Sequence, residues 1–266
     1  MARLIVVEDA DAVASATADR VVAILGGAIE TRGVAHLALS GGSTAGALYR
    51  ALLEPHRRAT VSWSQVEAWW GDDRLVGEAD PLSNVRAARE TILAPDTGLG
   101  LEPRRVHPFP IAEAQAVGLG PSWVAATYAA RLAERMSRDP AGDAIFDLIL
   151  LGMGSDGHVL SAFPGGPALD PAAPSVLDVP APTHVEPHVP RLTLHTRLVA
   201  AARAVLVMCT GAAKAGRVAE VLEGPWEPLR LPAQIARGAN ATWIVDAAAA
   251  AMLEAARPGG ERPGGA

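Results

Sequence analysis

The sequence predicts an α/β protein built on a Rossmann-like, open, mostly parallel sheet with helices on both faces. Short apolar runs, such as those at residues 4–7 and 34–39, alternate with longer stretches of helical periodicity, which is the pattern of βαβ units. The run at residues 149–151 ends abruptly at glycine and lacks polar alternation, as expected for a strand buried on both faces. The chain has 266 residues, of which 50% are hydrophobic, so it can bury a sizeable core. We expect one domain over residues 1–257 and a disordered, Pro- and Gly-rich tail over residues 258–266.

The first strand and the helix after it begin the alternation of strands and helices. The strand at residues 4–7 is followed by a helical stretch whose apolar face includes Val21 and Leu25, and Gly33 closes that helix. The second strand, at residues 34–39, follows at once. One βαβ unit is therefore expected within the first forty or so residues.

The turn at residues 40–44, SGGST, joins the second strand to the next helix. Its unpaired amides lie at the positive end of a helix dipole, which makes an anion site with phosphate as the obvious ligand. Gly42, Ser43 and Thr44 are therefore candidate phosphate-binding residues. The alternative is an ordinary turn in which Ser43 or Thr44 is the helix N-cap. Because no Gly-Lys-Ser/Thr ending is present, the turn is not a nucleotide P-loop.

A third strand is expected at residues 66–70, followed by the charged sequence GDDRLV. Asp72 and Arg74 would lie at the same edge of the sheet as the SGGST turn, although a solvated turn is the usual role of such a cluster. After it, Ser83 is expected to cap a helix over residues 84–93.

The most informative stretch is FDLILLGMGSDGHVLSAFP at residues 146–164. Its strand leads into a loop with three glycines, which permit positive φ and close approach of the backbone to a ligand. Ligands of open α/β sheets bind beyond the carboxyl ends of strands, so Asp156 and His158 are placed at the rim of a site. The spacing Gly-x-Gly-x-x-Gly also matches the dinucleotide fingerprint, but Pro164 cuts off the helix that this fingerprint needs. A satisfied surface histidine on a turn is the alternative for His158.

The remaining elements continue the alternation. Loops are expected at residues 108–121 and 165–190, a helix at 123–138, strands at 191–194, 204–208 and 242–245, and a final helix at 246–256. The long loop before the strand at 191–194 is expected to lie over the sheet edge, where such loops are often lids. Lys214 is expected on the first turn of the helix after the strand at 204–208, which puts a cation at another carboxyl end.

A metal site is not expected in the long loop, although three residues there are of a suitable type. His184, Glu186 and His188 are close together in sequence and are residue types that bind metals. Pro187 prevents the helical geometry of a paired-histidine motif.

Composition and charge exclude several classes of function. The net charge of −6 is spread over short segments without a basic stripe, so nucleic acid is not expected as a partner. The single Cys209 excludes an intramolecular disulfide, and no run approaches the ~20 apolar residues of a membrane span. We therefore expect a cytoplasmic protein without a membrane partner. Of 23 basic residues only Lys214 is lysine, whose compact ammonium reaches a phosphate or titrates more readily than a guanidinium does.

Five motifs stand in the order found in the 6-phosphogluconolactonase family, which the chain resembles over nearly its whole length. They are SGGST at 40–44, GDDRLV at 71–76, LGMGSDGHVLSAFPG at 151–165, PRLTL at 190–194 and TGAAK at 210–214. The resemblance implies a sugar-phosphate isomerase-like fold, no cofactor, and hydrolysis of the small-molecule lactone 6-phosphogluconolactone in the oxidative pentose phosphate pathway. A monomer or a weak homo-oligomer is expected.

The resemblance also implies roles for particular residues. Gly42, Ser43, Arg191 and Lys214 would bind the phosphate, Arg74 would contact the substrate and His158 would be catalytic, with Thr44 and Asp72 completing the binding set. The chain departs from the family pattern in two places: Val159 and Leu160 stand where Thr and Ala are usual, and Asp73 stands where Glu is usual. A role for a hydroxyl after His158 is therefore not expected.

The chemistry of a lactone agrees with these residues. A histidine, with an ordinary pKa near ~6.5, takes a proton from water and returns it to the departing ring oxygen. Asp156 either fixes the tautomer of His158 or only shapes the loop. Amides of the glycine loop or Arg74 would face the developing oxyanion. A covalent route is less favoured because no Gly-x-Ser-x-Gly elbow is present and Cys209 has no nearby histidine in sequence.

Two other functions stay open. Glucosamine-6-phosphate deaminases and related isomerases have a similar loop, but they continue into Phe-Asn-Glu-Pro, where this chain reads SAFP at 161–164. A non-catalytic sugar-phosphate sensor would carry a DNA-binding helical module ahead of the domain, whereas the first strand here is expected to begin at Arg3 or Leu4.

Overall fold

The computed structural model describes residues 1–254, and within that range its main element is a parallel sheet of seven strands. We call it the large sheet; its strand order is β1-β10-β9-β6-β2-β3-β5. In chain order the strands are β1 (Arg3–Val7), β2 (Ala35–Leu39), β3 (Val66–Trp70), β5 (Val106–His107), β6 (Leu148–Gly152), β9 (Val205–Cys209) and β10 (Ala241–Asp246). Apart from β5, each was predicted to within one residue at each end. Every residue of β2, β3 and β9 is buried, including His36 in β2 and Glu67 in β3, so these strands lack the polar alternation of a half-exposed strand.

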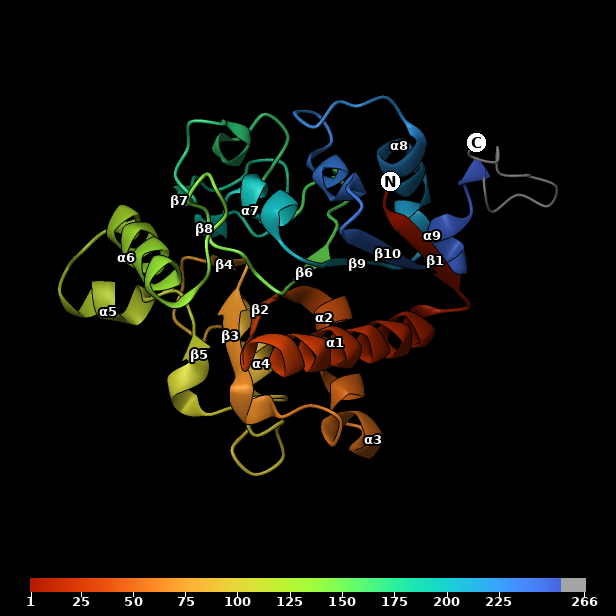
Figure 1. Cartoon of the computed structure of the whole chain (residues 1–266). Coiled ribbons are helices and arrows are strands. Elements are labelled where there is room, and N and C mark those ends of the chain that lie inside the picture. The colour runs from red at the N-terminus through yellow and green to blue at the C-terminus, as the bar shows by residue number, and fades with distance from the viewer. Residues whose placement is uncertain (255–266) are drawn as a thin grey trace.

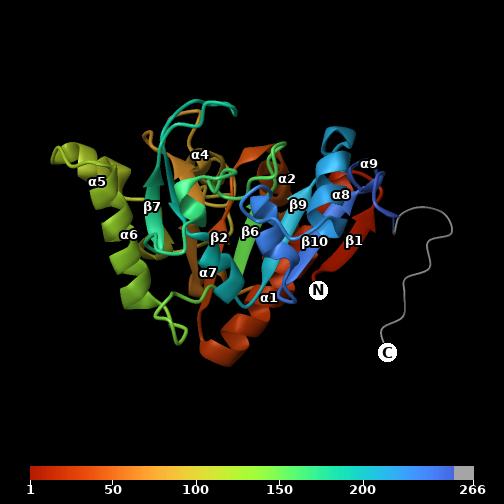
Figure 2. The ribbon, with the colours of Figure 1, turned by 90° about the horizontal axis from the view of Figure 1, so that it is seen from above.

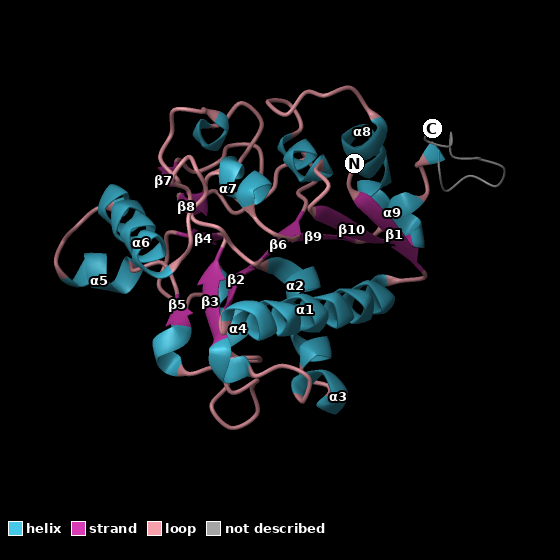
Figure 3. Cartoon of the chain, viewed as in Figure 1, coloured by secondary structure: helices cyan, strands magenta, loops and turns pink. Residues whose placement is uncertain are grey.

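Helices cover both faces of the large sheet, as predicted. Figures 1 and 3 show α1 and α2 on one side and α7 and α8 on the other. The helices are α1 (Ala10–Arg32), α2 (Gly42–Leu52), α3 (Pro55–Arg58), α4 (Asn84–Arg89), α5 (Ile111–Ala116), α6 (Pro121–Arg135), α7 (Thr196–Ala201), α8 (Ala215–Glu223) and α9 (Ala247–Ala250). The fold class predicted from the sequence is confirmed.

Three predicted boundaries need correction. The expected loop at residues 108–121 contains α5, which is too short to show helical periodicity. Helix α4 begins after its Ser83 cap as predicted but ends at Arg89, because the Thr91 hydroxyl and the Leu93 amide take its last carbonyls. Helix α9 is also shorter than predicted. The single-domain interpretation of residues 1–257 stays a prediction, as does the tail at 258–266, which lies outside the described residues.

Helix α1 is long and apolar, and it packs against one face of the large sheet. Among residues 1–254 it is the one helix that meets the length and composition of a membrane span. It contacts α2 and the strands β10, β2 and β9, and its buried positions include Val13, Val21 and Leu25. Asp9 caps its start, and Gly33, at φ 74°, closes it in the left-handed conformation.

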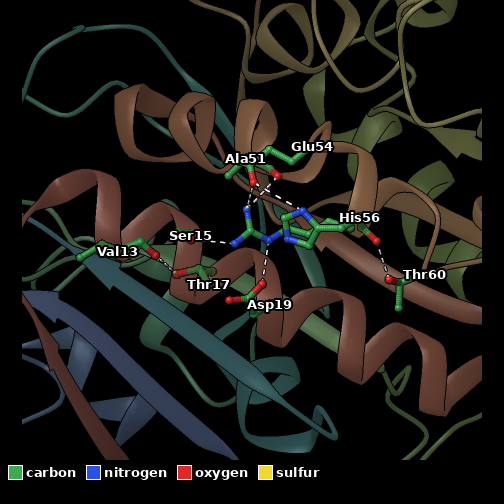
Figure 4. A network of polar contacts seen from close by, with 9 residues as sticks. Val13, Ser15, Thr17, Asp19, Ala51, Glu54, His56 and Thr60 are labelled. Carbon is green, nitrogen blue, oxygen red and sulfur yellow. Dashed lines mark hydrogen bonds and ion pairs between the residues drawn. The ribbon is translucent and has the colours of Figure 1, made fainter.

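A buried arginine ties α1 to α2 and α3. Arg57 is 4% exposed, and its Nε donates to Asp19 at 2.7 Å while its Nη2 donates to Ser15 at 2.6 Å. Its Nη1 donates to the carbonyl of Ala51 and to the carboxylate of Glu54. Figure 4 shows these four partners, from three segments of the chain, converging on one point. We call this group the Arg57 network.

A second, antiparallel sheet was largely missed by the sequence analysis. This small sheet has the order β4-β8-β7, formed by β4 (Asp72–Arg74), β8 (Arg191–Leu194) and β7 (Val176–Val179). Only β8 was predicted; β4 was interpreted as a charged loop and β7 as part of the long loop at 165–190. Three polar residues make no strand signal, and the pairing joins segments more than a hundred positions apart, as in Asp73 with Leu192. Figure 2 shows β7 beside α6, at the side of the molecule away from β1.

The topology of the large sheet fixes where a ligand binds. From β2 the chain proceeds outward to β3 and β5, and it then returns to β6, which pairs with β2 on the other side and continues toward β9 and β10. This reversal between β2 and β6 is the switch point at which open α/β sheets bind ligands, beyond the carboxyl ends of the strands. The SGGST turn follows β2, and the glycine loop with His158 follows β6.

Candidate active site

One cavity collects the predicted site residues at this switch point. It has a volume of about 370 Å³ and is lined by loops that follow β2, β6 and β9, together with residues of the small sheet. The predicted residues that line it are Gly42, Ser43, Thr44, Asp72, Arg74, His158, Arg191 and Lys214. Asp156 is the predicted site residue that does not line it; this carboxylate lies behind His158. The convergence expected from the sequence is present.

The SGGST turn opens helix α2 without a side-chain cap. Gly41 is the N-cap, so Ser43 and Thr44 lie inside the first turn and the alternative in which one of them caps the helix is wrong. Gly42 has φ 86°, a conformation that favours glycine, and it brings the turn to the cavity wall. First-turn amides and the helix dipole thus face the cavity, which is an arrangement for binding an anion.

A lysine reaches the cavity from the loop after β9. Lys214 ends the short 3-10 helix η4 (Ala212–Lys214), and its Nζ donates to the carbonyl of Met153 in the loop after β6. The amide of Gly211 donates to both oxygens of Asp246, at 3.0 and 2.9 Å, which fixes the start of this segment. The ammonium has three donors, so it keeps capacity for a ligand after the bond to Met153.

Two arginines come from neighbouring strands of the small sheet. Arg191 on β8 is 4% exposed, and it donates to the carbonyls of Val189 and Pro187. Its burial, and secondarily the charge of Arg74, lower the pKa of Arg191 from the usual arginine value. Arg74 pairs with Arg191 in the β4–β8 register. The two arginines place positive charge at the cavity wall, and the carboxylates of Asp72 and Asp73 partly offset it.

Asn84 organises the same wall and was missed as a site residue. Its Oδ1 accepts from Nη1 of Arg74 at 2.7 Å, and its Nδ2 donates to the carbonyl of Asp72 at 2.9 Å. A Cβ at Gly41 would lie 1.8 Å from Asn84 Oδ1, so only glycine fits beside this amide. One feature of the sequence points to this role: Asn84 follows the Ser83 cap and therefore stands at the start of a helix, close to the preceding turn.

The two aspartates of GDDRLV have different surroundings. Asp72 lines the cavity and accepts from the Ser161 hydroxyl at 2.7 Å. Asp73 is 1% exposed and instead accepts from the amides of Arg74 and Asn84 and from the hydroxyl of Ser83. Burial raises the pKa of Asp73 to about 6, against the effect of these hydrogen bonds. Asp73 therefore holds the turn together, whereas Asp72 faces the site.

The histidine and aspartate of the glycine loop form a pair. Nδ1 of His158 lies 2.5 Å from Oδ1 of Asp156, and the His158 amide donates to the same oxygen at 3.1 Å. Partial burial acts to raise the pKa of Asp156, but the hydrogen bonds and charge of His158 outweigh it and hold that pKa well below its usual range. A Cβ at Gly154 would lie 2.1 Å from the His158 ring, so glycine is needed there for the pair to form. With Nδ1 directed at Asp156, Nε2 is the nitrogen left to accept a proton.

Other residues that line the cavity were not predicted to bind the substrate or to act in catalysis. Leu160, with φ 54°, and Val185 and Glu186 of the long loop contribute to the wall, as does Cys209 at the end of β9. Burial raises the pKa of the Cys209 thiol to about 11, so it is protonated near neutral pH. No group of three or more His, Cys, Asp or Glu side chains in the described part of the chain is placed to hold a metal ion.

Taken together, the fold and the cavity define an α/β protein whose cavity is suited to a small anionic ligand and is lined by an oriented histidine. Residues 8–245 match the sequence model of one family, described as glucosamine-6-phosphate isomerases/6-phosphogluconolactonase. The chain belongs to this family.

Relatives and solved structures agree with this membership. The chain is 35% identical to a 6-phosphogluconolactonase of Streptomyces coelicolor over 255 residues, which cover 94% of each chain. It is 35% identical to a 6-phosphogluconolactonase of Synechocystis over 220 residues, covering 82% of this chain and 85% of the relative. The 6-phosphogluconolactonase structure from Trypanosoma brucei superposes with a TM-score of 0.83 and 26% identity, covering 95% of this chain and 99% of that one. A monomeric glucosamine-6-phosphate deaminase, at 18% identity and a TM-score of 0.75, shares the fold.

Proposed function

We propose that this chain hydrolyses 6-phospho-D-glucono-1,5-lactone to 6-phosphogluconate, the lactonase step of the oxidative pentose phosphate pathway. The observation that carries the proposal is that an oriented histidine and a set of phosphate-binding groups open onto one cavity. The similarity to curated 6-phosphogluconolactonases over almost the whole chain supports it.

The phosphate is bound where positive groups gather. The first-turn amides at Gly42 and Ser43, the ammonium of Lys214 and the guanidinium of Arg191 line the same cavity from three different elements. A phosphate that accepts from all of them gains charge-assisted hydrogen bonds, which are about twice as strong as neutral ones. Thr44 and Asp72 complete the wall, and a carboxylate is suited to accept from a sugar hydroxyl.

His158 acts as the base. Its Nε2 takes a proton from water, whose oxygen adds to the lactone carbonyl carbon and produces a tetrahedral oxyanion. The oxyanion collapses, the bond to the ring oxygen breaks, and the proton on His158 is returned to that oxygen, which becomes the free hydroxyl of the product. Asp156 holds the tautomer and stabilises the imidazolium between these two transfers.

Arg74 is the better of the two candidates for stabilising the oxyanion. The amides of Gly154 and Gly157 are already used inside their own loop, where they donate to the carbonyls of His158 and Gly154. Arg74 lines the cavity, and within residues 1–254 its Nη2 makes no hydrogen bond that would compete with a ligand. Its Nη1 is anchored to Leu82 and Asn84, so the guanidinium is held in one orientation before the ligand arrives.

Two parallel assays separate this function from the two alternatives. Freshly prepared 6-phosphogluconolactone is added to the protein in a pH-stat, and acid release is compared with spontaneous hydrolysis; glucosamine 6-phosphate is tested in parallel for ammonia release. A lactonase accelerates the first reaction only. A deaminase releases ammonia, and a sensor binds sugar phosphates without turnover of either compound, and either result would refute the proposal.

Finer properties belong to the same proposal. We expect a cytoplasmic protein that is a monomer or a weak homo-oligomer, with no nucleic-acid or membrane partner. The net charge of −6 without a basic stripe supports the expectation about nucleic acid. Sedimentation across a range of concentrations tests the association state.

A further inference from the structure

Asp156 contacts two histidines, and only one of them has a place in the proposed chemistry. Its Oδ1 accepts from His158, and its Oδ2 lies 3.0 Å from Nε2 of His184. Each carboxylate oxygen thus has its own imidazole. His184 does not line the cavity, and its side chain is about half exposed.

Phe163 fixes the spacing between the two imidazoles. Its ring is 5% exposed and packs at a tilt against His158, with a centroid separation of 4.7 Å. It meets His184 edge to face at 5.8 Å. The guanidinium of Arg191 lies over the same ring, 5.9 Å from its centroid. Packing on one buried ring therefore places both imidazoles so that they reach opposite oxygens of the same carboxylate.

The segment that carries His184 also forms part of the cavity wall. The next two residues, Val185 and Glu186, line the cavity. The segment is held from the other side by Arg191, whose Nη2 donates to the carbonyl of Pro187 at 2.9 Å. The contact between His184 and Asp156 is therefore a direct link from this wall to the group behind the catalytic histidine.

We infer that His184 is a positioning residue, which orients His158 by anchoring the second oxygen of Asp156. This inference rests on the proposed function, since the orientation matters only if His158 is the base. A carboxylate bound through one oxygen rotates about its Cβ–Cγ bond, and the Nδ1 contact of His158 then weakens. A donor on the other oxygen stops this rotation and keeps Nε2 directed at the cavity.

Three variants separate positioning from packing. His184→Phe keeps the aromatic contact with Phe163 but removes the donor, and we expect kcat to fall about three- to tenfold with KM little changed, the usual effect of one hydrogen bond. His184→Gln keeps an N–H at the position of Nε2 and is expected to restore most of kcat. His188→Gln is the matched control, because His188 is in the same segment but bonds to the carbonyl of Pro182 and leaves Asp156 untouched; its kcat is expected to stay within about twofold.

A double-mutant cycle tests whether the effect passes through Asp156. In an Asp156→Ala background, His184→Phe is expected to cause no further loss of kcat. The inference is overturned if the loss is the same in both backgrounds, if His184→Phe changes KM alone, or if His184→Phe and His184→Gln both match the parent.

A measurement without substrate keeps this inference distinct from the proposed function. The His158 Nδ1 proton, hydrogen-bonded to Asp156, gives a downfield signal in proton NMR, identified by its loss in His158→Gln. We expect the signal in the parent and in His184→Gln, and its broadening or loss in His184→Phe; an unchanged signal in His184→Phe overturns the inference. If the parent does not hydrolyse the lactone, the proposed function fails, and this signal still decides whether His184 positions His158.

Discussion

The Arg57 network and the Asp156–His158 pair are both polar clusters held by several hydrogen bonds, but only the second of these two opens onto the cavity. Arg57 donates through Nε, Nη1 and Nη2 to Asp19, Ser15, Ala51 and Glu54, so its capacity is used inside the protein. His158 uses Nδ1 on Asp156 and presents its other nitrogen at a cavity. A polar cluster can therefore serve as a binding or catalytic site when its neighbours orient one side chain and leave a donor or acceptor atom of that side chain facing a cavity.

Replacing His158 gives the largest expected effect on activity. His158→Gln removes the base while keeping size and polarity, and we expect kcat/KM for the lactone to fall by about 10²- to 10⁴-fold, the usual contribution of general acid–base catalysis. The melting temperature should change little. His56→Gln is the matched control, since His56 is exposed beside the Arg57 network and faces no cavity. An equal loss of kcat/KM in His158→Gln and His56→Gln would mean that His158 has no specific role in catalysis.

Lys214 tests the anion-binding side of the cavity. Lys214→Met removes the ammonium but keeps a long side chain, and we expect KM to rise by roughly 10- to 100-fold, as for the loss of one charge-assisted hydrogen bond, with a smaller effect on kcat. Lys214→Arg is expected to recover part of the affinity, because the charge returns with a different donor geometry. Arg138→Met, which removes an exposed charge outside the cavity, is the control. An unchanged KM in Lys214→Met would show that Lys214 does not bind the phosphate.

Removing Arg57 should affect stability and leave chemistry intact. Arg57→Met fills the buried space but leaves the Ala51 carbonyl and the Ser15 hydroxyl without their donor, and we expect the free energy of unfolding to fall by about 1–3 kcal/mol. The estimate stays below that for a fully buried ion pair because Asp19 and Glu54 are half exposed and remain hydrated. Urea denaturation measures the loss, and kcat below the melting range should equal that of the parent. A variant of normal stability with reduced kcat would contradict the structural role.

The comparison also explains which parts of the molecule the sequence could predict. Most strands of the large sheet are short, mainly apolar runs, and the loops at their carboxyl ends must meet at one edge. The convergence of Ser43, His158 and Lys214 therefore follows from local patterns and one topological rule. The small sheet gives no such pattern. Strand β4 is three charged or polar residues, and β7 lies in a proline-rich stretch, so both depend on pairing with β8.

Contacts between side chains that are far apart in the sequence could not be predicted either, because they also depend on tertiary packing. Asn84 and His184 act on groups 10 and 28 positions away, and neither distance has a helical or strand period that would predict the contact. His184 was considered only as a metal ligand, together with Glu186 and His188. Its partner, Asp156, was recognised through its neighbour His158. Such pairs are set by tertiary packing, which in this case is organised around Phe163.

Asp73 gives a test that depends on pH, because it is a buried carboxyl group that holds a turn rather than a group that faces the cavity. Its pKa is raised to about 6 by burial, so the folded chain binds this proton more tightly than the unfolded chain, where an aspartate has a pKa near ~3.9. The contribution to stability is therefore fully present below pH ~4 and is lost as pH rises through about 6, with a total on the order of 3 kcal/mol, of which roughly 2 kcal/mol falls between pH 4.5 and 7.5. Asp73→Asn should lack this slope, because an amide mimics the protonated acid: its oxygen accepts from the amides of Arg74 and Asn84 while its NH₂ donates to Ser83. Urea denaturation at pH 4.5 and 7.5 measures the free energy of unfolding of the parent and of Asp73→Asn. We expect the variant to gain stability relative to the parent at the higher pH. A difference between the two proteins that does not change with pH would mean that Asp73 is ionised in the folded chain across this range.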